Sequence, residues 1–281
     1  MATNRVGFKK FLKDLKENEE VHLIIDSNIL IAYFDEVHSD HEDAVEFLNQ
    51  IDNKTKATFF TTVTTKSEFL DYHRKRFLTE GLIGLVREFK ETIKISTKSK
   101  VKIQNTLTLR DNRLRKEEKK FSETQEFNSK ANYFTDNEIK EIKRTFRARD
   151  VHDETGWLKI CSVFLGKKLA GLERSLDEFC EYLTTRNKVQ KENIFTVKEV
   201  DWKKATSISS ETGMGYSDSM ILNMALSTNI ENIATLDFDV IYAGAVSASN
   251  KTILLPDHRI SSFKQILKKL PSVNAELKRK S

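Results

Sequence analysis

Four acidic residues occupy comparable points in an alternating pattern of strands and helices. Asp26 directly follows one apolar run, and Asp237 directly follows another. Glu68 lies shortly after a third β-rich run, and Asp218 opens a late helical pattern. If the runs are parallel strands of one sheet, their carboxyl ends meet at a single edge, where ligands bind in open α/β folds. The four carboxylates are therefore expected to converge there.

Carboxylates that lie close together repel one another unless a hard cation lies among them. Carboxylate oxygens suit Mg²⁺ or Mn²⁺, which keep bound water and take phosphate oxygens as further ligands. The helix that begins near Asp218 also favours the ionised form of that residue, because a helix N-terminus carries partial positive charge. The four acids are thus candidate metal ligands and candidate catalytic residues.

Each acid also has a purely structural interpretation. Asp26 can serve as the cap of the helix that follows it, since Asp, Ser and Asn all cap helices well. Asp218 can be an ordinary acid of a first helical turn, with Ser217 as its N-cap. Asp237 can be a turn residue, and Asp239 competes with it for the same role. Only the common order of the four acids favours the metal site over these interpretations.

The elements that would position the acids follow from apolar periodicity. Alternating strands and helices are typical of an α/β fold with a central parallel sheet. The Gly213-Met214-Gly215 sequence indicates a turn. We expect strands at 21–25, 57–63, 232–236 and 251–255, and helices at 5–18, after Asp26, at 41–51, from Thr64 or Thr65, and at 217–228.

The alternation stops between about 90 and 194, where the sequence is charged and mostly helical. Residues 98–149 hold 15 Lys and Arg against 8 Asp and Glu. Thr135-x-x-Glu138 has the pattern of a capping box that opens a helix through about 147. We therefore expect a discontinuous core at 1–89 and 195–270, a large, basic α-helical insertion at 90–194, and a flexible tail at 271–281.

Two further expectations concern this middle part. Residues 157–183 indicate one or two amphipathic helices, and 194–197 a short strand or a connection. The basic run is either a solvated helical face or an arm that contacts nucleic-acid phosphates. On the second interpretation the candidate contacts are Lys98, Lys100, Lys102, Arg110, Arg113 and Arg115.

The acid pattern resembles that of PIN-domain nucleases. This family shares an apolar strand that ends in Asp-x-Asn, an acid after the second strand, an acid that opens a late helix, and Thr-x-Asp after the next strand. The resemblance covers about 20–75 and 205–258 and does not extend to the long insertion. The matching segments are IIDSNIL with Asp26 and Asn28, TTKSEFL with Glu68, GYSDSMILNMAL with Asp218, and IATLDFDV with Thr235 and Asp237.

The resemblance implies a PIN-like three-layer fold and metal-dependent hydrolysis of phosphodiester bonds. Asp26, Glu68, Asp218 and Asp237 would bind one or two Mg²⁺ or Mn²⁺ ions. Asn28, Thr235 and Ser217 would orient ligands or water. It also implies an endoribonuclease with an RNA substrate, and many small members of the family are toxins that pair with a protein antitoxin.

Alternatives to a ribonuclease remain open at the level of the sequence. A structure-selective DNA nuclease would have the same acids, and a non-catalytic RNA-binding scaffold would keep the fold. A phosphatase of the haloacid-dehalogenase type would need Asp where Asn28 stands. A homodimer, in which the protein pairs with a second copy of itself, is a further alternative that the sequence leaves open.

Composition bounds the location of the protein. Cys161 and Cys180 are isolated, which fits a reducing compartment and excludes a disulfide framework. The N-terminal segment lacks the apolar core of a signal peptide, and no apolar run has transmembrane length. We therefore expect a cytoplasmic protein without a membrane partner. The net charge of +5 weakly favours a polyanionic ligand.

Overall fold

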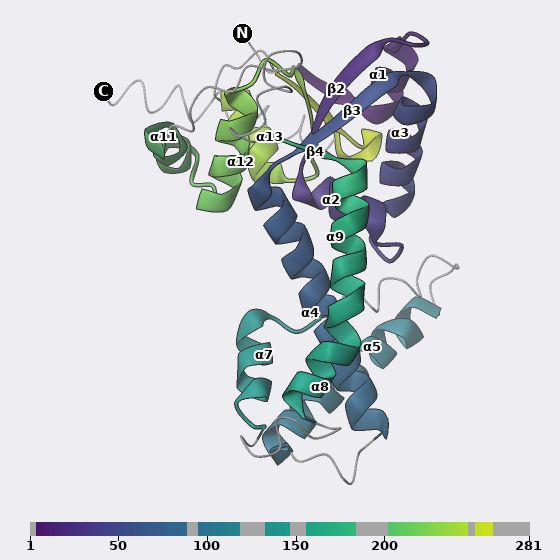
Figure 1. Ribbon diagram of the computed structural model, residues 1–281, viewed down its shortest axis with the longest axis vertical. Coiled ribbons are helices and arrows are strands. Elements are labelled where there is room, and N and C mark those ends of the chain that lie inside the picture. The colour runs from purple at the N-terminus through teal and green to yellow at the C-terminus, as the bar shows by residue number, and fades with distance from the viewer. Residues whose placement is uncertain are drawn as a thin grey trace. The chain divides into compact units, whose positions relative to one another are not determined.

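The computed structural model describes residues 4–88, 95–118, 133–146, 156–183, 202–246 and 251–260 (Figure 1). The chain forms two compact units. The sheet unit comprises Met1–Tyr33, Glu42–Lys66 and Cys180–Ser281, and the helical unit comprises Phe34–His41 and Ser67–Phe179. The expected strand or connection at 194–197 and the expected tail at 271–281 lie outside the described residues.

The sheet unit contains a six-stranded, all-parallel sheet in the order β1-β6-β5-β2-β3-β4. This topology confirms the predicted α/β class with a central parallel sheet. All four predicted strands are present, as β2, β3, β5 and β6. The strands are β1 (Asn4–Gly7), β2 (Glu20–Ile25), β3 (Lys56–Thr61), β4 (Glu181–Tyr182), β5 (Asn232–Ala234) and β6 (Thr252–Leu255).

Two strands were not predicted, and both are short. The helix expected at 5–18 is wrong at its start, because Asn4–Gly7 pairs with Thr252–Leu255 and α1 covers only Phe8–Asp14. Strand β4 has two residues, Glu181 and Tyr182, which pair with Phe60 and Thr61. It falls inside the segment predicted as a helical insertion. Neither strand is long enough to show the alternation that identifies a strand in a sequence.

The centre of the sheet is β2, which lies between β5 and β3. Its residues Leu23, Ile24 and Ile25 are fully buried. A continuous apolar run of this kind is typical of a parallel strand covered on both faces. The strand therefore carries the chain through the core and delivers the next residue, Asp26, to the carboxyl edge of the sheet.

Helices begin at or near that edge. Two of them, α12 and α13, pack on the sheet in one core cluster, with Leu222 and Val240 against Ile24 and Ile233. The predicted turn before α12 is present, and Gly213 has a φ of 75°, which favours glycine. The helices that lie in or start from the sheet unit are α1, α2 (Ser27–Phe34), α4 (Val63–Glu88), α11 (Trp202–Thr212), α12 (Tyr216–Leu226) and α13 (Phe238–Val246). A further helix, α3 (His41–Lys54), carries the predicted buried stripe.

The helical unit is built from most of α4 and from the middle of the chain. Its core gathers Leu82, Ile103, Phe134, Ile142 and Trp157. The predicted amphipathic segment at 157–183 is helical from Trp157 to Phe179, with a π-helical turn at Ser162–Gly166. Its other helices are α5 (Thr97–Glu118), α7 (Asp136–Lys143), α8 (Trp157–Cys161) and α9 (Lys167–Phe179).

The division into units differs from the predicted boundaries at 89/90 and 194/195. Helix α4 starts in the sheet unit and continues into the helical unit, so the chain passes between units at Lys66 rather than at the end of the helix. The return comes at Cys180, because β4 already belongs to the sheet. None of the helices in the described residues has the length and apolarity needed to cross a membrane.

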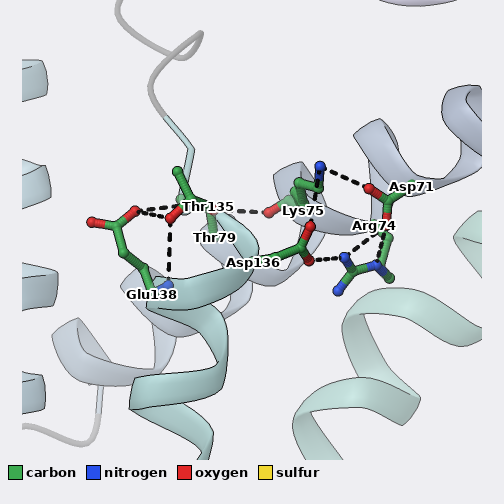
Figure 2. Close-up of polar contacts among 7 residues, drawn as sticks. All are labelled: Asp71, Arg74, Lys75, Thr79, Thr135, Asp136 and Glu138. Atoms are coloured by element: carbon green, nitrogen blue, oxygen red, sulfur yellow. Dashed lines mark hydrogen bonds and ion pairs between the residues drawn. The ribbon is translucent and has the colours of Figure 1, made fainter. Parts of the chain in front are cut away.

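The start of α7 is fixed to α4 by a polar network (Figure 2). The predicted capping box is confirmed: Thr135 Oγ1 accepts from the N–H of Glu138, whose carboxylate accepts from the N–H of Thr135. Arg74 and Lys75 of α4 both pair with Asp136 and with Asp71. Arg74 lowers the pKa of Asp136 through a direct hydrogen bond. The helix ends at Lys143, before the predicted end near 147.

A close approach in the helical unit depends on glycine. A Cβ placed on Gly81 of α4 would lie 2.6 Å from the ring of Phe164, which belongs to the π-helical turn. A Cβ placed on Gly84, one turn later in the same helix, would meet nothing within 4 Å. The two glycines therefore differ in function although they share a helix.

Alanine at these two positions should change stability in opposite directions. Gly81→Ala forces the Phe164 ring aside and should lower the free energy of unfolding by about 1–3 kcal/mol. Gly84→Ala fills open space in a helix and should raise it by up to about 1 kcal/mol. Urea denaturation of both variants measures the difference. Equal effects of the two substitutions would contradict the packing described for Phe164.

Candidate active site

Asp26 ends the central strand and begins a helix. Its N–H donates to the carbonyl of Ala234 on β5 at 3.0 Å, which continues the sheet by one residue. Its carbonyl accepts from the N–H groups of Ile29 and Leu30, so Asp26 is also the N-cap of α2. The residue is only 2% exposed. The buried carboxylate therefore lies at the point where β2 turns into α2.

Hydrogen bonds join Asp26 to Asp237 across 209 to 211 residues of sequence. Thr235 Oγ1 donates to Asp26 Oδ2 at 2.6 Å and accepts from the N–H of Asp237 at 3.0 Å. Asp237 Oδ2 accepts from Asn28 Nδ2 at 3.4 Å. Asp26 Oδ1 accepts from the N–H of Ser27 at 2.7 Å. We call the group of Asp26, Asn28, Thr235 and Asp237 the carboxylate ring.

Asp237 is the N-cap of α13. Its Oδ1 accepts from the N–H of Asp239 at 2.6 Å, and its carbonyl accepts from the N–H of Ile241 at 3.1 Å. Asp239 thus supports Asp237 through its backbone, whereas its own side chain is exposed. Of the two neighbouring acids, Asp237 is the one that contacts the carboxylate ring.

The carboxylate ring concentrates negative charge at two helix N-termini. The donors named above are neutral groups, so they orient the carboxylates of Asp26 and Asp237 without cancelling their charge. A helix N-terminus stabilises a nearby anion by about 0.3–1 kcal/mol, which is small beside the cost of burying a carboxylate. The carboxylate oxygens of Asp26 and Asp237 are ligands of the kind that a hard divalent cation prefers.

Arg259 brings a positive charge towards the same edge. Its Nη1 donates to the carbonyl of Leu236 at 3.3 Å, and Leu236 lies between Thr235 and Asp237. Arg259 lies four residues beyond Leu255, where β6 ends, which is too far along the chain for the strand pattern alone to indicate a residue of the sheet edge.

Asp218 lies in the first turn of α12 and is half-buried. The N-cap of this helix is Gly215, so the expected N-cap role of Ser217 is wrong, and Ser217 is an exposed residue of the first turn. A Cβ on Gly215 would lie 3.0 Å from Asp218 Oδ2, a tight contact that places this carboxylate beside the cap of its own helix. The carboxylate folds back over its own helix N-terminus.

The position of Asp218 follows from the chain path. Helix α12 ends at Leu226 and β5 begins at Asn232. A connection this short makes the helix run antiparallel to the strand, so the first turn of α12 lies at the carboxyl edge of the sheet. Asp26, Asp218 and Asp237 of the sheet unit therefore share one edge.

A buried lysine holds the connection between α12 and β5. Lys251 Nζ donates to the carbonyls of Thr228 and Ile230 at 2.7 and 2.5 Å. Burial lowers the pKa of Lys251 from its ordinary value to about 8. Lys251 directly precedes β6 and satisfies two backbone carbonyl groups of the connection, beyond the last residue of α12.

Glu68 lies in α4, within the part of the helix that belongs to the helical unit, and is half-buried. The three other acids belong to the sheet unit. The role of Glu68 as a metal ligand therefore stays a prediction from the sequence.

Two of the six candidate nucleic-acid contacts form ion pairs within the helical unit. Lys102 pairs with Glu138 and Glu141. Arg110 is 7% exposed and lies 2.9 Å from Glu80. The helical spacing of Ile103, Leu107 and Arg110 explains this burial, because it places all three on one face. Lys98 is exposed, Lys100 is half-buried, and the side chains of Arg113 and Arg115 lie outside the described part of α5.

No protein-family model, curated protein or solved structure matches the chain. The sequence resemblance to PIN-domain nucleases thus stays a prediction, and of the residues that carry it, Asp26, Asn28, Thr235 and Asp237 are joined by hydrogen bonds.

Replacement of Thr235 by valine should disrupt the carboxylate ring without changing the volume of the side chain greatly. Thr235→Val leaves both Asp26 Oδ2 and the N–H of Asp237 without this partner, at a cost of about 1–3 kcal/mol. Thr235→Ser keeps the hydroxyl and should recover most of the loss. Chemical denaturation measures both variants. A valine variant as stable as the serine variant would show that the two hydrogen bonds do not hold the edge together.

The stability that depends on Lys251 should increase with pH. Its folded-state pKa, about 8, lies below the ordinary value of 10.5, so between these values the unfolded chain binds a proton that the folded chain does not. The stability that this pKa difference provides is fully present above pH 10.5 and is lost as the pH falls through 8. Over that range it changes the free energy of unfolding by about 3 kcal/mol. The free energy of unfolding of wild type minus that of Lys251→Met should therefore rise from pH 7.5 to pH 9.5. A difference that stays flat or falls would contradict the cost of burying the charged amine.

Proposed function

We propose that the chain is a Mg²⁺- or Mn²⁺-dependent endoribonuclease with a PIN-like core. The observation that carries this proposal is the carboxylate ring. It brings Asp26 and Asp237 together at the carboxyl edge of a parallel sheet, through Thr235 and Asn28. Asp218 starts a helix at the same edge. Asp26, Asp218 and Asp237 are the acids of the sequence resemblance that belong to the sheet unit.

The donor set fits a hard divalent ion. Asp26, Asp218 and Asp237 would hold it through carboxylate oxygens, and Glu68 is the fourth ligand expected from the sequence. Within the ring, Thr235 and Asn28 each donate to an acid, so they hold the carboxylates in fixed directions. Such fixed partners of ligand side chains are typical of metal sites.

The chemistry is hydrolysis of a phosphodiester bond by water. When bound, a divalent ion lowers the pKa of a coordinated water and offsets the charge that develops on the phosphate. Asp26 and Asp237 position the reacting groups and accept hydrogen bonds from water. Ser217, an exposed residue of the first turn of α12, would orient a ligand or water at this edge, as the resemblance implies. Arg259 supplies a positive charge beside Leu236.

A non-catalytic scaffold is the second candidate, and a specific observation favours it. Asp26 and Asp237 are both helix N-caps, so their places in the fold have a structural explanation. The hydrogen bonds from Thr235 and Asn28 stabilise a scaffold as well as an enzyme, so activity and metal binding must distinguish the two. A DNA substrate, a role as a toxin with a protein antitoxin, and a homodimer are further hypotheses for the same fold.

Replacement of the acids should abolish cleavage while the fold persists. Asp26→Asn and Asp237→Asn should each lower the rate of Mg²⁺-dependent cleavage of a single-stranded RNA by about a hundredfold or more, because each removes an anionic ligand. EDTA should stop the wild-type reaction and added Mn²⁺ should restore it. The matched control is Asp239→Asn, an exposed acid two residues from Asp237, which should keep full activity.

Metal binding provides a readout that does not depend on activity. Calorimetric titration with Mg²⁺ or Mn²⁺ should show binding to wild type and Asp239→Asn and weaker binding to Asp26→Asn. Binding without cleavage of RNA or DNA would support a scaffold instead. Cleavage that survives removal of Asp26, Asp218 and Asp237 would exclude the site. Glu68→Gln, tested in both assays, decides whether the helical unit supplies a ligand.

A further inference from the structure

The sheet unit exposes three large apolar side chains among its described residues. They are Val63, Tyr216 and Phe238, at 63%, 48% and 41% exposure. Each is the first residue of a helix: α4, α12 and α13, respectively. Single exposed apolar residues are normal on protein surfaces. Three of them that all occupy the first position of a helix form a pattern that calls for a common explanation.

All three residues lie at the edge that carries the acids. Helix α4 follows β3 after Thr62, and α13 follows β5 after Asp237, so both begin at the carboxyl ends of strands. Helix α12 begins at the same edge by the chain path described above. Phe238 directly follows Asp237, and Tyr216 precedes Asp218 by two residues. The first turn of a helix normally favours polar or acidic side chains, so folding does not account for these aromatic residues.

The two aromatic side chains are held in place by neighbours. The ring of Phe238 lies parallel to that of Tyr242, with an interplanar angle of 18° and centroids 6.1 Å apart. The hydroxyl of Tyr216 forms a hydrogen bond with Thr206 of α11. Helix α11 packs against both α12 and α13. The rings are therefore supported at one side while a large part of each stays accessible to solvent.

A lysine lies on the face of α11 that carries Thr206, the hydrogen-bond partner of Tyr216. Lys203 is exposed and precedes Thr206 by three residues, so it lies one turn away on the same face of α11. The ammonium group of Lys203 could therefore contact a phosphate of a nucleic-acid strand that passes over Tyr216. Aromatic rings with an adjacent cation are typical of surfaces that bind single-stranded nucleic acid.

We propose that Phe238 and Tyr216 form a stacking platform for unpaired bases at the edge of the sheet that carries the carboxylate ring. The inference rests on the proposed function for the identity of the ligand. A base in a duplex is stacked on its neighbours and presents no free face, whereas an unpaired base stacks on an aromatic ring whatever its sequence. The platform therefore selects single strands, loops or ends, and reads little or no sequence.

The test is binding of a fluorescent single-stranded RNA of about ten nucleotides, measured by anisotropy. Ca²⁺ replaces Mg²⁺ as a hard cation that takes oxygen ligands. The double variant Phe238→Leu/Tyr216→Leu keeps the apolar volume but removes the aromatic faces, and it should bind about tenfold more weakly. Phe238→Tyr should bind as wild type does. The matched control is Leu109→Ala, which removes an apolar side chain of 61% exposure from the helical unit and should have no effect.

A second ligand isolates the contribution of the bases. An oligonucleotide of the same length with abasic sites at its central positions should bind wild type about as weakly as the double leucine variant binds the intact strand. The double variant should not distinguish the two ligands. Thermal melting of each variant confirms that the fold is retained.

Three results would overturn the platform. They are unchanged affinity of the double leucine variant, equal affinity of wild type for intact and abasic strands, and a duplex bound as tightly as a single strand. Any of them would show that this edge does not stack bases. Metal-dependent cleavage that the double leucine variant does not affect would refute the platform but keep the nuclease. Base-dependent binding without cleavage would refute the nuclease but keep the platform.

Discussion

The hydroxyl group of Thr235 is the contact on which the candidate site depends. It donates a hydrogen bond to the Asp26 carboxylate and accepts one from the backbone N–H of Asp237, so one side chain positions both acids. This contact requires the register between β2 and β5, in which Ile25 pairs with Ala234. A shift of one residue would turn every side chain of a strand to the opposite face, and Asp26 would lose Thr235. The apolar residues that specify this register are therefore as important for the site as the acids themselves.

The convergence of Asp26 and Asp237 was predictable because it follows from strand direction alone. Two apolar runs identify two parallel strands, and parallel strands end at one edge. The N-cap roles were open alternatives in the sequence, and the structure shows that Asp26 and Asp237 each combine a capping position with a place in the carboxylate ring. Which of Asp237 and Asp239 takes this place could not be predicted, because it depends on the path of the backbone into α13. Likewise the N-cap of α12 is Gly215, two residues before Ser217, the alternative considered from the sequence.

The basic segment shows where charge patterns fail as a guide. A run of lysines and arginines indicates positive charge, but the spacing that places Arg110 in line with Ile103 and Leu107 leads its side chain into the unit, where Glu80 lies beside it. Lys102 is similarly matched by two acids of α7 that are distant in sequence. Tertiary pairing of this kind cannot be read from a local count of charges. The short strands β1 and β4 were missed for a related reason, since a partner strand rather than an intrinsic pattern defines them.

Strand β4 has a consequence for how this architecture can change over generations. It pairs with β3, so the long segment 67–179 departs soon after one strand and returns at its immediate neighbour in the sheet. Because the two strands are joined by backbone hydrogen bonds, their spacing does not depend on the length of what lies between them. Lengthening, shortening or exchanging that segment would leave the geometry around Asp26 intact. The edge of the sheet that carries Asp26 and Asp237 can thus be retained while the segment between the two strands varies in length and sequence.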